Sequence, residues 1–145
     1  MCGIVGFLQS EVFTSPKNTQ ECLQSMTDSI IYRGPDSEGH WYDLDDQIAL
    51  GHRRLAILDL SESGHQPMLS DDDRYVIAFN GEIYNHLEIR QEIESAIPTI
   101  IWKGHSDTET LLKAIQVFGW EETLQKLVGM FAIALWDQQQ KELTL

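Results

Sequence analysis

The sequence begins with Met1-Cys2-Gly3-Ile4-Val5-Gly6-Phe7-Leu8, and this stretch decides what fold the chain can adopt. Its apolar and β-branched residues predict a buried strand almost at the terminus. The first residues of a domain are usually poorly ordered unless a strand or a helix holds them. We therefore expect a fold in which the N-terminus lies inside the domain.

Cys2 directly follows the initiator methionine, so removal of Met1 would leave a thiol and a free α-amine on one residue. An α-amine titrates at pH about 7.7–8.0, close to working pH, and can accept the thiol proton without a histidine. Terminal amines activate nucleophiles in known variants of triad chemistry. There are two alternatives to a nucleophile activated by its own amine. Cys2 could be a small thiol that only packs in a buried strand, or it could pair with His52, although no spacing in the sequence supports such a pair.

Hydrophobic periodicity and turn residues predict alternating helices and strands further along the chain. The predicted helices run from Asn18 to the break at 33–36, from Asn85 to Pro98, from Ser106 to Gly119, and as a short turn over 120–127. Capping boxes are predicted at the first residue of each of the three longer helices. The predicted strands lie at 41–42, 48–58, 75–79, 130–136 and 142–145, and suggest antiparallel sheets.

Charge and cysteine content exclude several classes of protein. The chain has 145 residues, of which 42% are hydrophobic, and 23 acidic against 10 basic residues give a net charge of −13. This charge repels phosphate backbones and anionic lipids, so we expect neither nucleic acid nor membrane as a partner. With no membrane-length apolar run and no signal peptide, we predict a cytoplasmic protein. Two cysteines and no zinc-ligand spacing predict neither a disulfide framework nor a metal site.

The pair Asn80-Gly81 follows the strand predicted at 75–79. Asn-Gly is the strongest short signal for a hairpin turn. However, only residues 82–84 separate the pair from the helix start at Asn85, which is short for a returning strand. An asparagine side chain and a glycine N–H that point at one spot would instead form an oxyanion hole, and we favour this interpretation.

Arg53 and Arg54 stand in a predicted strand, where neighbouring side chains point to opposite faces. One of them can face a cleft and bind a substrate carboxylate, but periodicity does not say which. Asp107 opens a predicted helix, where a carboxylate is favoured by the helix dipole in any protein. It could also bind a substrate ammonium group.

Several segments occur in a specific order, and together they resemble one family. They are Met1-Cys2-Gly3-Ile4-Val5-Gly6-Phe7, Arg33-Gly34-Pro35-Asp36, Gly51-His52-Arg53-Arg54-Leu55-Ala56-Ile57, Gly64-His65-Gln66-Pro67-Met68, Asn80-Gly81-Glu82-Ile83-Tyr84-Asn85 and Ser106-Asp107-Thr108-Glu109. This set resembles the glutaminase domain of class II, N-terminal-nucleophile amidotransferases of the asparagine synthetase type. The match runs over essentially the whole chain, so we expect one domain at 1–145.

The resemblance implies an α+β fold, a four-layer αββα sandwich of antiparallel sheets of the N-terminal-nucleophile (Ntn) hydrolase type. It also implies the hydrolysis of L-glutamine. Cys2 would be the nucleophile and, through its α-amine, the base. The Asn80 side chain and the Gly81 N–H would stabilise the tetrahedral oxyanion.

The same resemblance implies how the substrate would be held. Arg54 would bind the α-carboxylate of glutamine, and Asp107, with Glu82 nearby, would bind its α-ammonium group. Backbone groups around Ile57 and Leu58 would line the same pocket. No cofactor is expected in this domain.

The family also implies a partner. Ammonia would pass to a C-terminal ATP-dependent synthetase domain that uses ATP and Mg, and this chain lacks its Ser-Gly-Gly-x-Asp-Ser stretch. We therefore expect a C-terminally truncated piece of a longer synthetase. The sequence leaves open whether the acceptor is aspartate or a sugar, whether Met1 is removed, and whether the protein forms a homodimer. A non-catalytic docking or regulatory module with the same fold is the alternative.

Overall fold

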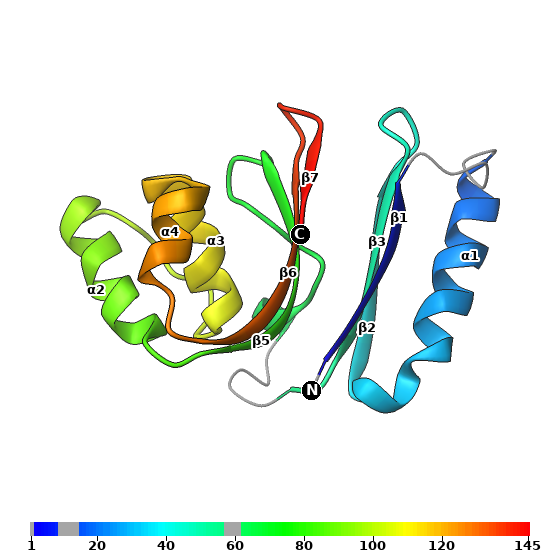
Figure 1. Cartoon of the computed structure of the whole chain (residues 1–145), viewed down its shortest axis with the longest axis horizontal. Helices are drawn as coiled ribbons and strands as arrows, with labels where there is room; N and C mark the ends of the chain where they lie inside the picture. The colour runs from blue at the N-terminus through cyan, green and yellow to red at the C-terminus, as the bar shows by residue number, and fades with distance from the viewer. Residues whose placement is uncertain (1, 9–14, 57–61) are drawn as a thin grey trace.

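The computed structural model describes residues 2–8, 15–56 and 62–145. Two antiparallel sheets lie face to face, with one helix outside the first sheet and three helices outside the second (Figure 1). This arrangement confirms the predicted α+β fold, a four-layer αββα sandwich of antiparallel sheets. The reason for the layering is that each sheet must bury one face against its neighbour and the other against helices.

The first sheet, sheet A, has three strands in the order β1 (Gly3–Leu8), β3 (Ile48–Arg54) and β2 (Ser37–Asp43). Helix α1 (Pro16–Ser29) covers its outer face, and a 3-10 turn, η1 (Ile31–Arg33), follows. The predicted cap at Asn18 is wrong, because the helix begins two residues earlier. Ser15 is the N-cap and accepts a hydrogen bond from the Asn18 N–H at 3.2 Å. Pro16 occupies the first helical turn. A backbone N–H there would have no partner inside the helix, so the missing N–H of proline has no cost.

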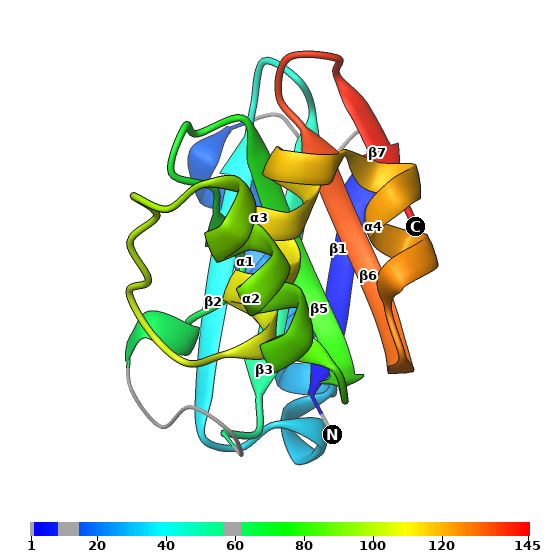
Figure 2. The ribbon, with the colours of Figure 1, turned by 90° about the vertical axis from the view of Figure 1, so that its left-hand side faces the viewer.

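The second sheet, sheet B, has the strand order β4 (Met68–Leu69), β5 (Tyr75–Ile83), β6 (Gly129–Asp137) and β7 (Glu142–Thr144). A 3-10 turn, η2 (Glu62–Gly64), precedes it. Helices α2 (His86–Ala96), α3 (Asp107–Phe118) and α4 (Trp120–Lys126) cover its outer face (Figure 2). Among the described residues, no helix has both the length and the apolar character needed to cross a membrane.

Strand β5 is longer than the sequence predicts. We expected it to end at Phe79, but it continues to Ile83 because residues 80–83 pair with 129–132 of β6. Asn80-Gly81 therefore lies inside a strand, and the hairpin turn is excluded. Gly81 has no room for a side chain, since a Cβ there would collide with the Met130 carbonyl and with Phe131.

The helix starts on the sheet B side show where local signals suffice. Ser106 caps α3 as predicted, with its Oγ accepting the Glu109 N–H at 3.1 Å, and Gly119 closes the helix at a positive φ of 82°. Asn85 is the N-cap of α2, but its side chain bonds Lys126 and Val128 rather than the helix. The predicted capping box at Asn85 is therefore wrong.

Two hydrophobic cores hold the layers together. One fills the space between the sheets and is centred on buried Trp136, Leu50 and Ile48. The other lies between sheet B and its helices, where Ile89, Ile93 and residues of α3 meet β5 and β6. The two sheets are thus fixed against each other, and a site formed between them has a rigid frame.

Candidate active site

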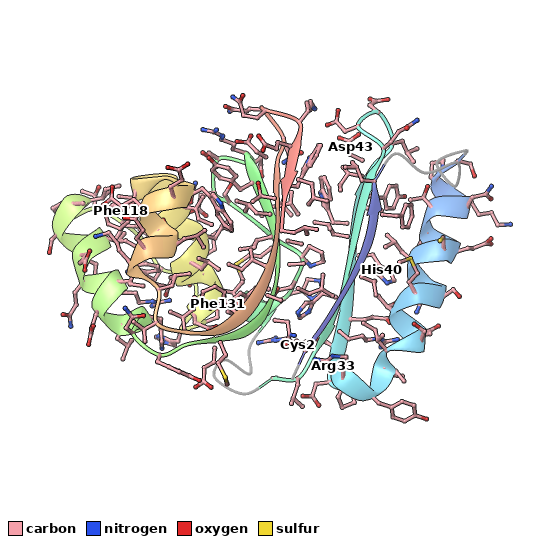
Figure 3. The ribbon with its side chains drawn as sticks, viewed as in Figure 1. Cys2, Arg33, His40, Asp43, Phe118 and Phe131 are labelled. Carbon is pink, nitrogen blue, oxygen red and sulfur yellow. The ribbon has the colours of Figure 1, made fainter. Side chains whose placement is uncertain are left out.

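A cavity of about 420 Å³ opens at the end of the space between the two sheets. Its walls come from the N-terminus, from the end of β3, from the second half of β5 and the first of β6, and from the start of α3. Figure 3 shows Cys2 at this end, with Arg33 beside it and Phe131 on the side of sheet B. Six predicted site residues line the cavity: Cys2, Arg54, Asn80, Gly81, Glu82 and Asp107.

Cys2 is held at the start of β1 with its thiol toward sheet B. Side chains alternate along a strand, and Ile4 packs in the core between the sheets, so Cys2 faces the same way. The Leu55 N–H lies 3.4 Å from Sγ, and Sγ lies 3.7 Å from the Leu55 carbonyl. Arg33 Nε donates to the Cys2 carbonyl at 2.9 Å. Cys2 is thus held both at its half-buried Sγ, by Leu55, and at its backbone carbonyl, by Arg33.

His52 does not pair with Cys2. Its ring is fully buried, and Nε2 donates to the Phe79 carbonyl at 3.0 Å. Burial lowers the pKa of His52 to about 4, so the ring is neutral at neutral pH. The alternative of a Cys2–His52 pair therefore finds no contact to support it, and the ring instead ties the two sheets together.

The backbone of β5 presents the Gly81 N–H to the cavity. In an antiparallel strand, the polar groups of alternate residues point to the same edge. Phe79 N–H donates to Gln66 Oε1 at 2.6 Å and Ile83 N–H to Asp107 Oδ2 at 3.0 Å, both on the edge that faces away from β6. Gly81 is two residues from each of them along the strand, so its N–H points to the same edge.

Asn80 is half-buried next to Gly81 and turns toward the inter-sheet space. Its Oδ1 is buried and has no hydrogen-bond partner among the residues that the structure describes. Rotation about the side-chain amide torsion is soft, because such terminal torsions are broad. Since no partner fixes Oδ1, the amide can present its N–H groups to a molecule in the cavity.

The two arginines lie on opposite faces of sheet A. Arg54 follows the inward face of β3, lines the cavity and lies against Gly64, where a Cβ would collide with its guanidinium. Arg53 points outward beneath α1 and bonds Asp28 at 2.5 Å and Glu38 at 2.6 Å. Only Arg54 of the pair is placed to meet a ligand in the cavity.

Asp107 is a buried carboxylate on the far wall of the cavity, with 6% of the residue exposed. Burial raises its pKa above the usual range, while the hydrogen bond from the Ile83 N–H opposes that rise. Glu82 is exposed and lines the same cavity. The cavity therefore has a guanidinium on one wall and carboxylates on another, an arrangement that fits an amino acid with both α-groups charged.

Two predicted residues, Ile57 and Leu58, lie outside the described residues. Sequence reasoning also gave no role to several residues that line the cavity, above all Gln66 and Thr108. The only sequence signal for Gln66 is its place in the segment Gly64–Met68. Within the described ranges, no group of three His, Cys, Asp or Glu side chains could hold a metal ion.

The fold and the cavity define a four-layer α+β protein with its second residue in the site. A solved structure of similar fold is the glutamine phosphoribosylpyrophosphate amidotransferase from B. subtilis complexed with ADP and GMP, with a TM-score of 0.67 and 20% identity over 94% of this chain and 34% of that one. Residues 1–145 match the family described as the glutamine amidotransferase domain. The chain belongs to this family.

Curated relatives carry the same domain in longer chains. Asparagine synthetase [glutamine-hydrolyzing] 1 of Bacillus subtilis is 40% identical over 138 residues, which are 95% of this chain and 21% of the relative. Amidase chry2 of Gibberella zeae is 32% identical over 150 residues, which cover 99% of this chain and 22% of the amidase. The chain thus spans about a fifth of the length of these relatives.

Proposed function

We propose that this domain hydrolyses the side-chain amide of L-glutamine through a thioester on Cys2. The observation that carries the proposal is the position of the Cys2 thiol, which shares one cavity with Asn80, Gly81, Arg54 and Asp107. A cavity of about 420 Å³ falls within the usual range for small-molecule sites. It can enclose one amino acid.

Removal of Met1 gives Cys2 its own base. The α-amine takes the thiol proton, and the thiolate attacks the amide carbon of glutamine. The tetrahedral intermediate collapses when the amine returns the proton to the leaving nitrogen, which departs as ammonia. Water then attacks the thioester, and glutamate leaves as the Cys2 thiol is regenerated.

Asn80 and Gly81 stabilise the charge that develops during both steps. The Gly81 N–H points to the cavity edge of β5, and the Asn80 amide is free to turn toward the same point. The Gly81 N–H is fixed by the strand and needs no reorganisation as the charge forms, and the Asn80 amide supplies a second donor to the oxyanion. This pair therefore acts on kcat more than on substrate binding.

Arg54 and Asp107 recognise the two charged ends of glutamine. The guanidinium binds the α-carboxylate, and the Asp107 carboxylate, with Glu82 nearby, binds the α-ammonium group. Backbone groups around Ile57 and Leu58 line the same pocket. A site with buried partners for both ends rejects amides that lack them, because those partners would be left unpaired.

The ammonia serves a separate ATP-dependent synthetase domain, with ATP and Mg bound there and aspartate as the acceptor. Names such as asparagine synthetase [glutamine-hydrolyzing] among the relatives support this assignment. Their chains are several times longer than this one, which leaves room for such a domain.

Glutamine hydrolysis by wild type and by two cysteine variants tests the proposal. Cys2→Ala should abolish ammonia release. Cys22→Ala should not, because Cys22 lies on α1 with its Sγ 4.0 Å from Met26 Sδ, on the far side of sheet A. Mass spectrometry of the active protein should show a chain that begins at Cys2. Equal loss in both variants would show that Cys2 is not the nucleophile, and activity with Met1 retained would show that its α-amine is not the base.

A further inference from the structure

Gln66 joins two neighbouring segments that both line the cavity. The residue is buried, with 5% exposed, in the turn before β4. Its Oε1 accepts the Phe79 N–H at 2.6 Å, and its Nε2 donates to Thr108 Oγ1 at 3.2 Å. Phe79 directly precedes Asn80, and Thr108 directly follows Asp107. One side chain therefore spans from β5 to the start of α3.

The edge of β5 needs such a contact. Strand β4 pairs only with Val76 and Ile77, and beyond these residues the described chain places no strand on that edge. An edge N–H without a partner is costly when buried. Gln66 supplies the partner for Phe79, and Asp107 supplies the partner for Ile83.

The backbone of Phe79 is held at both of its polar groups. Gln66 accepts its N–H, and His52, which comes from sheet A, donates to its carbonyl at 3.0 Å. The peptide that carries this carbonyl also contains the nitrogen of Asn80. Any movement of Phe79 therefore shifts Asn80 and Gly81 relative to Cys2 on the facing sheet.

We propose that Gln66 is a positioning residue that fixes the Asn80 and Gly81 donors relative to Asp107. The inference rests on the proposed glutaminase function. Both ends of the Gln66 amide are engaged by protein groups, so it acts through β5 rather than on the substrate. Its effect should appear in the step where the oxyanion forms, because that step depends on donor placement.

Gln66→Met tests the role, since methionine has a similar length and makes neither hydrogen bond. We expect kcat for glutamine to fall about 10–100-fold, the range for small misplacement of catalytic groups, while KM changes less than about threefold. Gln116→Met is the matched control, because Gln116 stands near the C-terminal end of α3, outside the lining of the cavity, and its Nε2 donates to Asp72 Oδ1 at 3.0 Å. That variant should keep the wild-type kcat.

A second pair of variants separates positioning from folding. Thr108→Val removes the acceptor for Gln66 but keeps the shape of the side chain, whereas Thr108→Ser keeps the hydroxyl. We expect kcat of the valine variant to be at least about threefold below that of the serine variant. Amide hydrogen exchange of residues 76–84, followed by mass spectrometry, should be faster in Gln66→Met than in wild type or Gln116→Met.

The outcomes distinguish the two proposals. Unchanged exchange at 76–84, or a kcat of Gln66→Met within about twofold of wild type, would overturn the positioning role. So would an equal loss of kcat in Gln116→Met, or a rise in KM alone. If wild type shows no Cys2-dependent hydrolysis, the glutaminase function fails, and faster exchange then reports a structural contact with no catalytic part.

Discussion

Asp107→Asn should weaken glutamine binding and leave the fold intact. The carboxylate is buried, and its Oδ2 accepts the Ile83 N–H at 3.0 Å. Asparagine has the same shape, and its amide oxygen can accept that same hydrogen bond. The substitution therefore removes the negative charge that would face the substrate ammonium group and little else.

The magnitude follows from the loss of one charged hydrogen bond. Such a bond contributes about 1.5–3 kcal/mol, which corresponds to a rise in KM for glutamine of about 10–150-fold. The ammonium group is bound equally in the ground state and in the transition state, so kcat should change much less. Asp45→Asn is the control, because Asp45 is an exposed carboxylate in the turn between β2 and β3.

The same variant should not lose stability at neutral pH. Burial raises the pKa of Asp107 above its ordinary value of 3.8, so the folded protein holds this proton more tightly than the unfolded chain. At pH values between the ordinary pKa and the raised pKa, the folded protein binds more protons than the unfolded chain. The free energy of unfolding therefore falls as the pH rises through this range. Above the raised value wild type carries the full cost of a buried charge, and Asp107→Asn does not.

Steady-state glutaminase kinetics and urea unfolding at acid and neutral pH provide the measurement. We expect higher KM, similar kcat, and a free energy of unfolding at neutral pH that equals or exceeds that of wild type. A KM within about twofold of wild type would refute the role of Asp107 in binding the ammonium group. A large loss of stability at neutral pH would refute the assignment of its raised pKa to burial.

Three further predictions use the same two measurements. Asn80→Ala should lower kcat about 10²–10³-fold, the usual effect of losing one oxyanion donor, with little change in KM. Arg54→Lys should raise KM about tenfold, because an ammonium group cannot reproduce the bidentate fork. Arg53→Lys should leave KM unchanged and lower the free energy of unfolding by about 1 kcal/mol through the lost Nε bond to the Thr27 carbonyl. If Arg53→Lys raises KM and Arg54→Lys does not, the two roles are exchanged.

Local signals predicted the elements whose boundaries depend on neighbours in sequence. Helix α3 begins and ends as expected because Ser106 caps one end and Gly119 closes the other. The end of β5 was missed because it depends on pairing with β6, about 50 residues away in the chain. The start of α1 was missed because Ser15 and Pro16 form the cap, while Asn18 only resembles one.

The residues of the candidate site also differ in whether the sequence predicts them. Cys2 can be inferred from its position after Met1, since a terminal amine and a thiol on one residue are themselves a chemical signal. Gln66 carries no such signal, because its two partners stand 13 and 42 residues away. A buried polar side chain gains its role from those partners, and no period in the sequence brings them together.

The cavity lies at the end of sheet B that is opposite to its large inward side chain. The inward residues of β6 are Trp136, Ala134 and Ala132, opposite Val76, Ala78 and Asn80 on β5. Facing sheets stay about 10 Å apart, so Trp136 fills the layer and Ala132 does not. The first two pairs belong to the buried core, and the third lines the cavity. The space for a substrate therefore opens beyond the core, at the Ala132 and Asn80 end of sheet B, and the strand that begins at Gly3 brings Cys2 to that same end.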